Sequence, residues 1–416
     1  MLIEFKVSNF LSIKDEVVLS LDSASISNLK ENTFQELDYS LLKTIVIYGA
    51  NASGKSNIMK ALFFACQMIK ESVNFKVDTE IPRVPFLLNN DTKLKPTNFE
   101  FTFIKNEVRY IYGFSCDKRG FVEEYLKYKP KGENLKTYYI RDENKEERFK
   151  FYVDSKLQTN WGKETILKRL YLPVAVNDRN YEALKDVYDY FLNDIIIVFG
   201  ILSQWRDYTR DKLIQDVEFK SWVLEIMKKA DFGGILDLKI EKKKVPPIEL
   251  KNELGQLLFR ALPDEQREIF DLSFIHKDED GKFVEFKENL ESSGTRKTLD
   301  ILGQIYNILQ TGKTLFIDEF ELYLHPNITE FIIRLFQSKH NKKNGQLVVT
   351  THDTTLLKNK GLFRRDQVYI CSKDPNKATE LNSLDNFDLR ESLSFENAYL
   401  NGRVGGLPFI DENFFE

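Results

Sequence analysis

The chain has 416 residues, a net charge of −4 and a pI near 5.9, with 42% hydrophobic and 13% aromatic residues. This length predicts two lobes, or one domain with an insertion, and the composition excludes an intrinsically disordered protein. The acidic balance argues against a generally basic nucleic-acid binder.

Three scattered cysteines, Cys66, Cys116 and Cys371, suit a reducing cytosol better than a disulfide framework. The first residues lack the pattern of a signal peptide, and the longest apolar run, residues 195–202, is too short to span a membrane. We therefore expect a cytoplasmic protein without a membrane partner. The lysine-rich run at 239–244 is a candidate basic patch, although such runs are more often solvated faces.

The first part of the chain predicts strands at residues 2–7 and 16–21, each with one apolar face. Residues 42–48 form a nearly continuous β-branched run, which is typical of a strand buried on both faces. A glycine loop follows, and residues 57–70 place apolar side chains at helical spacing. The sequence therefore predicts a strand, a loop and a helix in succession.

The middle of the chain changes pattern twice. Residues 98–153 contain alternating segments that predict an antiparallel β subdomain, and residues 156–231 have helical periodicity. Strand patterns return at 235–243, and a hairpin is expected with its turn at 278–281.

The last third predicts a helix at 298–310 that Gly312 terminates, a buried strand at 315–318, a helix at 328–337 and another buried strand at 346–350. This order with short connections implies a parallel sheet covered by helices.

These elements predict a three-part α/β chain. The N-terminal part of a head occupies residues 1–155, a helical insertion occupies 156–231, and the C-terminal part of the head occupies 232–416.

The loop at residues 49–56 reads GANASGKS, with two glycines that let the backbone turn so that its amides point at phosphate oxygens. Lys55 is expected to neutralise the β- and γ-phosphates, and Ser56 to ligate Mg²⁺. The residues expected to surround ATP are Gly49, Ala50, Asn51, Ser53, Gly54, Lys55, Ser56 and Asn57. A chance match is on the order of one in a hundred, and the flanking strand and helix make it rarer.

Residues 314–319, TLFIDE, form an apolar strand that ends in two acids. In the same parallel sheet, Asp318 would lie beside the phosphate loop as a partner of Mg²⁺, and Glu319 could polarise the attacking water. His352 follows the next buried strand. A single histidine in that place is usually structural, but its order after the acidic pair favours a catalytic role.

Residues 290–297, LESSGTRK, precede a predicted helix. Ser292 or Ser293 could simply cap this helix. Alternatively, Ser292, Ser293 and Gly294 could use the same helix N-terminus to meet the γ-phosphate bound to a second subunit.

Taken in this order, the four segments resemble the ABC-type ATPase head, the group of the SMC, RecF and overcoming-lysogenization-defect (OLD) ATPases. GANASGKSN resembles its Walker A, ESSGTRK its signature loop, TLFIDE its Walker B and TTHD its switch-histidine loop. Segments 321–326 (ELYLHP) and 401–410 (NGRVGGLPFI) resemble OLD-like AAA ATPases, closest to the RloA-type and AriA-type proteins of phage-defence operons. The signature loop departs from the more common Ser-Gly-Gly, and Glu321 stands where a D-loop aspartate is usual.

The resemblance implies a P-loop NTPase of ABC-ATPase type that uses ATP and Mg²⁺. Two subunits would enclose ATP between the phosphate loop of one and Ser292, Ser293 and Gly294 of the other, with Glu319 as general base and His352 at the γ-phosphate. It also implies a separately encoded effector, such as a Toprim nuclease. The alternative is a DNA-repair or DNA-maintenance ATPase of RecF or SMC type. A transporter subunit, a small-molecule kinase and an inactive binding module fit less well.

Overall fold

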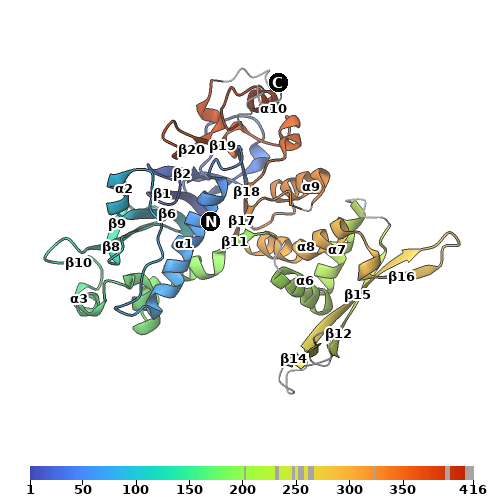
Figure 1. Cartoon of the computed structure of the whole chain (residues 1–416), viewed down its shortest axis with the longest axis horizontal. Coiled ribbons are helices and arrows are strands. Elements are labelled where there is room, and N and C mark those ends of the chain that lie inside the picture. The colour runs from blue at the N-terminus through green and yellow to red at the C-terminus, as the bar shows by residue number, and fades with distance from the viewer. Residues whose placement is uncertain are drawn as a thin grey trace. The chain divides into compact units, whose positions relative to one another are not determined.

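The computed structural model describes residues 1–200, 203–229, 234–245, 249–251, 257–260, 267–322, 324–388 and 394–407, and the chain falls into two compact units. The first unit is drawn from Met1–Gly200, Ile308–Leu322 and Ile332–Glu416, and the second from Ile201–Asn307 and Tyr323–Phe331. Figure 1 colours both by residue number.

A six-stranded sheet in the first unit carries the phosphate loop (Figure 1). Its order is β11 (Ile195–Phe199), β17 (Thr314–Asp318), β18 (Gln346–Thr350), β5 (Thr44–Tyr48), β19 (Val368–Lys373) and β20 (Thr379–Ser383). All neighbouring strands are parallel except β19 and β20. Every residue of β5, β17 and β18 is buried, as expected where both faces are covered. The predicted buried strands and their parallel arrangement are confirmed.

A seven-stranded antiparallel sheet forms the second layer of this unit. Its order is β10 (Phe149–Phe151), β9 (Lys136–Asp142), β8 (Phe121–Pro130), β7 (Val108–Cys116), β6 (Thr97–Lys105), β1 (Leu2–Ser8) and β2 (Val17–Ser20). A hairpin of β3 (Thr33–Glu36) and β4 (Tyr39–Leu42) and helix α2 (Asn90–Leu94) complete the N-terminal part. The predicted β subdomain is confirmed. Together the two sheets confirm the predicted fold class, an α/β P-loop NTPase with a mixed sheet.

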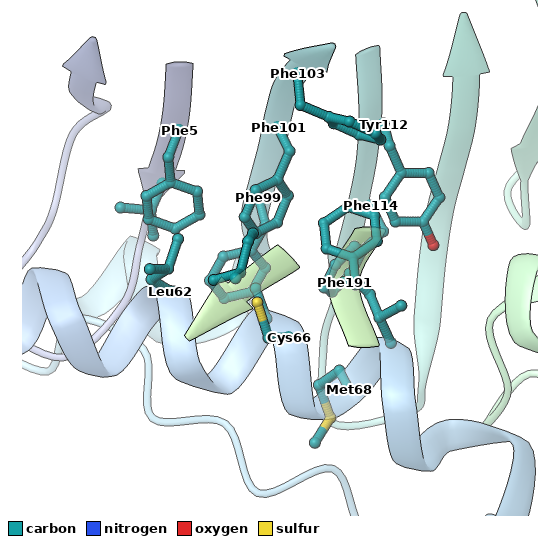
Figure 2. Close-up of a cluster of buried hydrophobic side chains, with 14 of the residues drawn as sticks. Phe5, Leu62, Cys66, Met68, Phe99, Phe101, Phe103, Tyr112, Phe114 and Phe191 are labelled. Atoms are coloured by element: carbon teal, nitrogen blue, oxygen red, sulfur yellow. The ribbon is translucent and has the colours of Figure 1, made fainter. Parts of the chain in front are cut away.

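Helix α1 (Lys55–Glu71) begins directly after the phosphate loop and packs against the antiparallel sheet. Figure 2 shows Leu62 and Cys66 of this helix facing Phe5 and Phe99 of the strands, in one buried cluster. Burying an apolar side chain of this size contributes about 1.5–3 kcal/mol. The helix that positions Lys55 is therefore fixed by the core beneath it.

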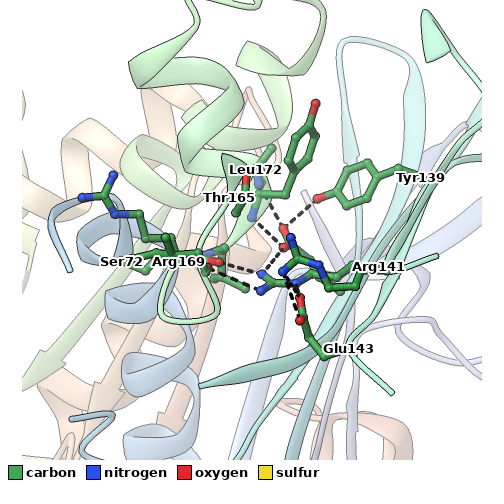
Figure 3. A network of polar contacts seen from close by, with 12 residues as sticks. Ser72, Tyr139, Arg141, Glu143, Thr165, Arg169 and Leu172 are labelled. Carbon is green, nitrogen blue, oxygen red and sulfur yellow. Dashed lines mark hydrogen bonds and ion pairs between the residues drawn. The ribbon is translucent and has the colours of Figure 1, made fainter. Parts of the chain in front are cut away.

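A buried carboxylate joins this sheet to the segment after α3 (Ser155–Glu164). Glu124 accepts four hydrogen bonds, from the hydroxyls of Tyr112 (2.9 Å) and Tyr139 (2.7 Å) and from the backbone amides of Tyr171 (2.6 Å) and Leu172 (3.0 Å). Nη1 of Arg141 lies 3.7 Å from Glu124, and both side chains are fully buried. Figure 3 shows the guanidinium of Arg141 against Glu143 and the carbonyl of Arg169. Each charge thus has several hydrogen-bond partners, which a buried ion pair requires.

The predicted helical insertion at 156–231 needs correction in two respects. Ile195–Phe199 is strand β11, parallel to β17, because a β-branched run fits a buried strand as well as a helix. The segment up to residue 200 belongs to the first unit, with α4 (Tyr171–Pro173) and α5 (Lys185–Asp189) beside two π-helical turns. Its aromatic side chains share the core of α1, which is why the unit boundary falls later than expected.

The second unit contains helices α6 (Ser203–Gln215) and α7 (Val217–Lys229) and a three-stranded antiparallel sheet of β12 (Asp237–Val245), β15 (Arg267–Lys277) and β16 (Phe283–Lys287). A further hairpin pairs β13 (Glu249–Lys251) with β14 (Leu257–Arg260). The turn predicted at 278–281 is confirmed by a hydrogen bond from Gly281 N to Asp278 O, 3.0 Å.

Two helices begin in the second unit and end in the first, α8 (Ser293–Thr311) and α9 (Pro326–Gln337). Gly312 follows α8 with a φ of +73°, which confirms it as the predicted terminator. Near the C-terminus, α10 (Phe395–Leu400) lies in the first unit. Of the described helices, none is long and apolar enough to cross a membrane.

Candidate functional site

The phosphate loop connects β5 to α1 and can hold its shape only with glycine at two positions. Gly54 has a φ of +116°, and a Cβ there would stand 2.1 Å from Oγ1 of Thr379. A Cβ on Gly49 would stand 2.3 Å from the carbonyl oxygen of Cys371. Gly49 therefore packs directly against strand β19 and Gly54 against strand β20, and these contacts hold the loop in place.

The Lys55 ammonium lies within this loop, where Nζ donates to the carbonyls of Gly49 (2.7 Å) and Ala50 (3.1 Å). Burial lowers the pKa of Lys55, while Cys371, Glu321, Asp318 and Glu319 raise it. Ser56 is the second residue of α1, as a Mg²⁺ ligand in this loop would be.

A chain of hydroxyl groups joins the loop to two distant segments. Oγ1 of Thr379 donates to the carbonyl of Ser53 (2.9 Å) and lies 2.7 Å from Oγ of Ser12. Asn57 donates to Ser12 (2.7 Å), and Lys373 donates to Thr379 (2.8 Å). Of these residues, the sequence predicted only Ser53 and Asn57. Ser12 belongs to the segment Asn9–Ile13, which resembles the N-terminus of the same ABC-type ATPase group, but no local pattern marks Thr379 or Lys373. The fold brings these three residues together from the two ends of the chain.

The acidic pair, Asp318 and Glu319, lies at the carboxyl end of β17, and strand β18 separates β17 from β5. Asp318 is buried and accepts a 2.6 Å hydrogen bond from Oγ1 of Thr350 on β18. The same hydroxyl oxygen accepts from the amide of Glu319 (2.8 Å), whose φ of +52° turns the chain out of the strand. Thr350, which the sequence did not indicate, therefore holds the carboxylate of Asp318 and the backbone of Glu319.

The switch loop, residues 351–353, follows β18 at the same end of the sheet. Thr351 N donates to the carbonyl of Ile47 (3.1 Å), and the Tyr48 hydroxyl donates to the carbonyl of Asp353 (3.0 Å). The amide of His352 donates to Oε1 of Glu321 (2.8 Å). The loop is thus bonded both to the strand that enters the phosphate loop and to the turn after the acidic pair.

The charges of Lys55 and of three acids act on His352. Burial lowers the pKa of His352, and Lys55 lowers it further, while Glu321, Glu319 and Asp318 raise it. Because Coulomb interactions fade with distance in a protein, Lys55 and the three acids that act on the pKa of His352 belong to its surroundings.

The signature loop lies in the second unit. Oγ of Ser292 accepts from the amide of Thr295 (3.0 Å), so this serine caps helix α8, which begins at Ser293. Ser293 and Gly294 occupy the first two positions of that helix. The capping role is present, and the meeting of Ser292, Ser293 and Gly294 with a second copy stays a prediction.

An opening of about 590 Å³ adjoins the phosphate loop. Its polar wall includes Asn51, Asn57 and Lys373, and its apolar wall is formed by residues 84–88 with Leu11. A cavity with one apolar wall and a few polar groups is typical of a site for a small ligand.

Among the described residues, no group of three or more His, Cys, Asp and Glu side chains could hold a metal by itself. Asp318 and Ser56 nevertheless fit Mg²⁺, which usually takes one or two protein ligands and completes its shell with phosphates and water.

A protein family matches most of the chain. The family described as "AAA domain, putative AbiEii toxin, Type IV TA system" matches residues 45–164 and 172–358. No curated protein matches the chain. Three solved structures of SMC heads are similar. The SMC head bound to the C-winged helix domain of ScpA is 15% identical, with 96% of this chain and 99% of that chain covered and a TM-score of 0.41.

The SMC head domain from Thermotoga maritima is 14% identical, with 92% and 98% of the two chains covered and a TM-score of 0.39. The third is an Smc head with an extended coiled coil, bound to a ScpA domain derived from Pyrococcus furiosus; it is 12% identical, with 97% and 98% covered and a TM-score of 0.38. The fold assignment rests on the strand order and the phosphate loop of this chain, not on these likenesses.

Proposed function

Because the chain belongs to the family of AAA domains described as putative AbiEii toxins of type IV toxin–antitoxin systems, we propose that it binds ATP with Mg²⁺ and hydrolyses it. The observation that carries this proposal is the gathering of Lys55, Asp318, Glu319 and His352 at the carboxyl ends of neighbouring parallel strands. Ligands of open α/β sheets bind at these ends.

Each residue has a distinct part in the proposed reaction. The loop amides and the N-terminus of α1 hold the phosphates, and Lys55 leaves the carbonyls of Gly49 and Ala50 to neutralise them. Mg²⁺, held by Ser56 and Asp318, would offset the charge of the phosphates. Glu319 accepts a proton from the attacking water, and His352 donates to the γ-phosphate.

The opening beside Asn57 would take the base and ribose of the nucleotide. Its apolar wall suits the faces of a purine, and Lys373 at its rim suits the polar edge of the ribose or the α-phosphate.

The active form proposed here is a dimer that closes over ATP. Ser292 caps α8, a helix long enough for a strong N-terminal partial charge, and this end would meet the γ-phosphate held by a second copy. Closure by ATP and release on hydrolysis would couple the chemistry to a change of shape.

The biological role proposed is regulation of a separately encoded effector in phage defence. It rests on the resemblance of residues 321–326 and 401–410 to RloA-type and AriA-type ATPases, and residues 408–410 lie outside the described part of the chain. The basic run at 239–244 gives no support to the DNA-maintenance alternative, because Lys242 and Lys243 pair with Asp211 and Asp271.

The test compares the ATPase rate and the size of the wild-type protein with those of Glu319→Gln. We expect the variant to bind ATP, to hydrolyse it at least a hundredfold more slowly and to accumulate as an ATP-dependent dimer. The same charge change at the exposed Glu147 serves as the control. Equal rates for Glu319→Gln and wild type would refute the assignment of Glu319. A variant that stays monomeric with ATP would refute the dimer.

A further inference from the structure

Glu321 is a site carboxylate to which the proposed mechanism gives no part. It lies in the turn after β17, which is closed by a hydrogen bond from Leu322 N to Glu319 O, 2.9 Å. A second bond, from Phe320 N to Thr350 O at 2.9 Å, ties this turn to the end of β18. The backbone that carries Glu321 is therefore fixed on both sides, beside the switch loop.

The two oxygens of Glu321 have different surroundings. Oε1 accepts the 2.8 Å hydrogen bond from the amide of His352. Oε2 is buried, and no hydrogen-bond partner for it exists among the described residues. A carboxylate that serves only to satisfy one backbone amide would gain more by turning its second oxygen to water, since desolvating that oxygen is costly. The side chain is held in place despite this cost.

The charge of Glu321 acts on both cationic groups of the site. Glu321 raises the pKa of Lys55 and of His352 more than Asp318 or Glu319 does. Burial and the charge of Lys55 both lower the pKa of His352, and Glu321 is the strongest group acting against them. An imidazole can donate to a phosphate through either tautomer, but its protonated form binds the phosphate more strongly.

We propose that Glu321 is a positioning residue for the switch histidine: it holds the backbone of the switch loop so that the His352 ring faces the γ-phosphate. The proposal rests on the proposed ATPase function. The link is direct, because Glu321 follows the general base Glu319 in the same fixed turn. A movement of the Walker B segment is thereby passed to His352 through one hydrogen bond.

Two variants separate the parts of this role. Glu321→Gln keeps an oxygen acceptor for the His352 amide but removes the charge, whereas Glu321→Ala removes both. Relative to wild type, we expect kcat to fall about fivefold in Glu321→Gln and about fiftyfold in Glu321→Ala, with KM for ATP within twofold. Glu147→Gln, at an exposed position, is the matched charge control and keeps the wild-type rate. An unchanged kcat in both Glu321 variants would overturn the proposal. A loss of ATP affinity as large as the loss of kcat would also overturn it.

A second measurement does not depend on ATP hydrolysis. The ring signal of His352 in the free protein, identified by its loss in His352→Gln, is titrated by NMR in wild type and in Glu321→Gln. We expect the titration to move to lower pH in Glu321→Gln, because the negative charge that raises the pKa of His352 most is gone while Lys55, Asp318 and Glu319 remain. An unmoved titration would overturn the proposal. If wild type neither binds nor hydrolyses ATP, the proposed function fails, and this titration still decides whether Glu321 acts on His352.

Discussion

The buried carboxylate of Glu124 allows a quantitative prediction about stability. Glu124→Gln keeps the size of the side chain but replaces one acceptor oxygen by an NH₂ group. If Oε1 keeps the tyrosine hydroxyls and Leu172 N, the new donor faces the amide of Tyr171, now 2.6 Å from Oε2. Leaving one buried amide unpaired costs about 1–3 kcal/mol. The charge of Arg141 also loses a partner 3.7 Å away, although it keeps Glu143.

Removing one partner of a buried ion pair costs about 3–5 kcal/mol. Because Arg141 keeps Glu143 as a partner, we expect a loss of unfolding free energy near the lower end of this range, about 3 kcal/mol. For a unit of about 300 residues, an unfolding entropy of about 2.1 cal/mol/K per residue means that each kcal/mol lowers Tm by about 1.6 °C, so Tm should fall by about 5 °C. Thermal unfolding followed by tyrosine fluorescence measures this change. Glu133→Gln, which removes an exposed pair with Lys136, is the control and should leave Tm unchanged. A Tm for Glu124→Gln within 1 °C of wild type would show that the hydrogen bonds counted here do not stabilise the unit.

Two further predictions concern backbone shape and pH. Gly54→Ala should weaken binding of a fluorescent ATP analogue at least tenfold, because its Cβ would stand 2.1 Å from Thr379. The control Gly132→Ala, with a φ of +76° and open space around it, should bind the analogue like wild type. Equal affinities of Gly54→Ala and wild type would contradict the packing argument. Burial raises the pKa of Asp300 from 3.8 to about 6, so its contribution to stability is present below about pH 4 and is lost as the pH rises through 6. As the pH rises from 4 to 7, the unfolding free energy of Asp300→Asn should therefore increase by about 2–3 kcal/mol relative to that of wild type, as measured by urea denaturation at each pH. A difference between the two proteins that does not change with pH would contradict this.

Most of the strands and the phosphate loop could be predicted from the sequence, because each depends on a local pattern. Residues 42–48 and 346–350 are apolar runs of strand length, and the spacing of Gly49, Gly54 and Lys55 has few other uses. The run at Ile195–Phe199 shows the limit of this reasoning. Apolar residues without polar neighbours fit the helical period and the strand equally well, and only pairing with the distant β17 decides between them.

The supporting residues of the site could not be predicted, since their partners are distant in sequence. Thr379 acts through its contact with Gly54 and Ser53, and Thr350 through Asp318. A threonine near the end of a strand has no pattern that distinguishes it from an ordinary strand residue. Glu321 was noticed only because it replaces an expected aspartate, and its bond to His352 follows from the geometry of the turn.

The strand order also has a consequence for synthesis on the ribosome. Strand β5 carries the phosphate loop, yet both strands that flank it, β18 and β19, begin only at Gln346 and Val368. At about 5–20 residues per second, a newly made β5 waits roughly 15–60 s before either neighbour has been translated. During that time an apolar strand with two unpaired edges is exposed to other chains, which favours aggregation or capture by a chaperone. A prematurely terminated chain would contain the whole phosphate loop and still lack the sheet that gives it a shape able to bind a nucleotide.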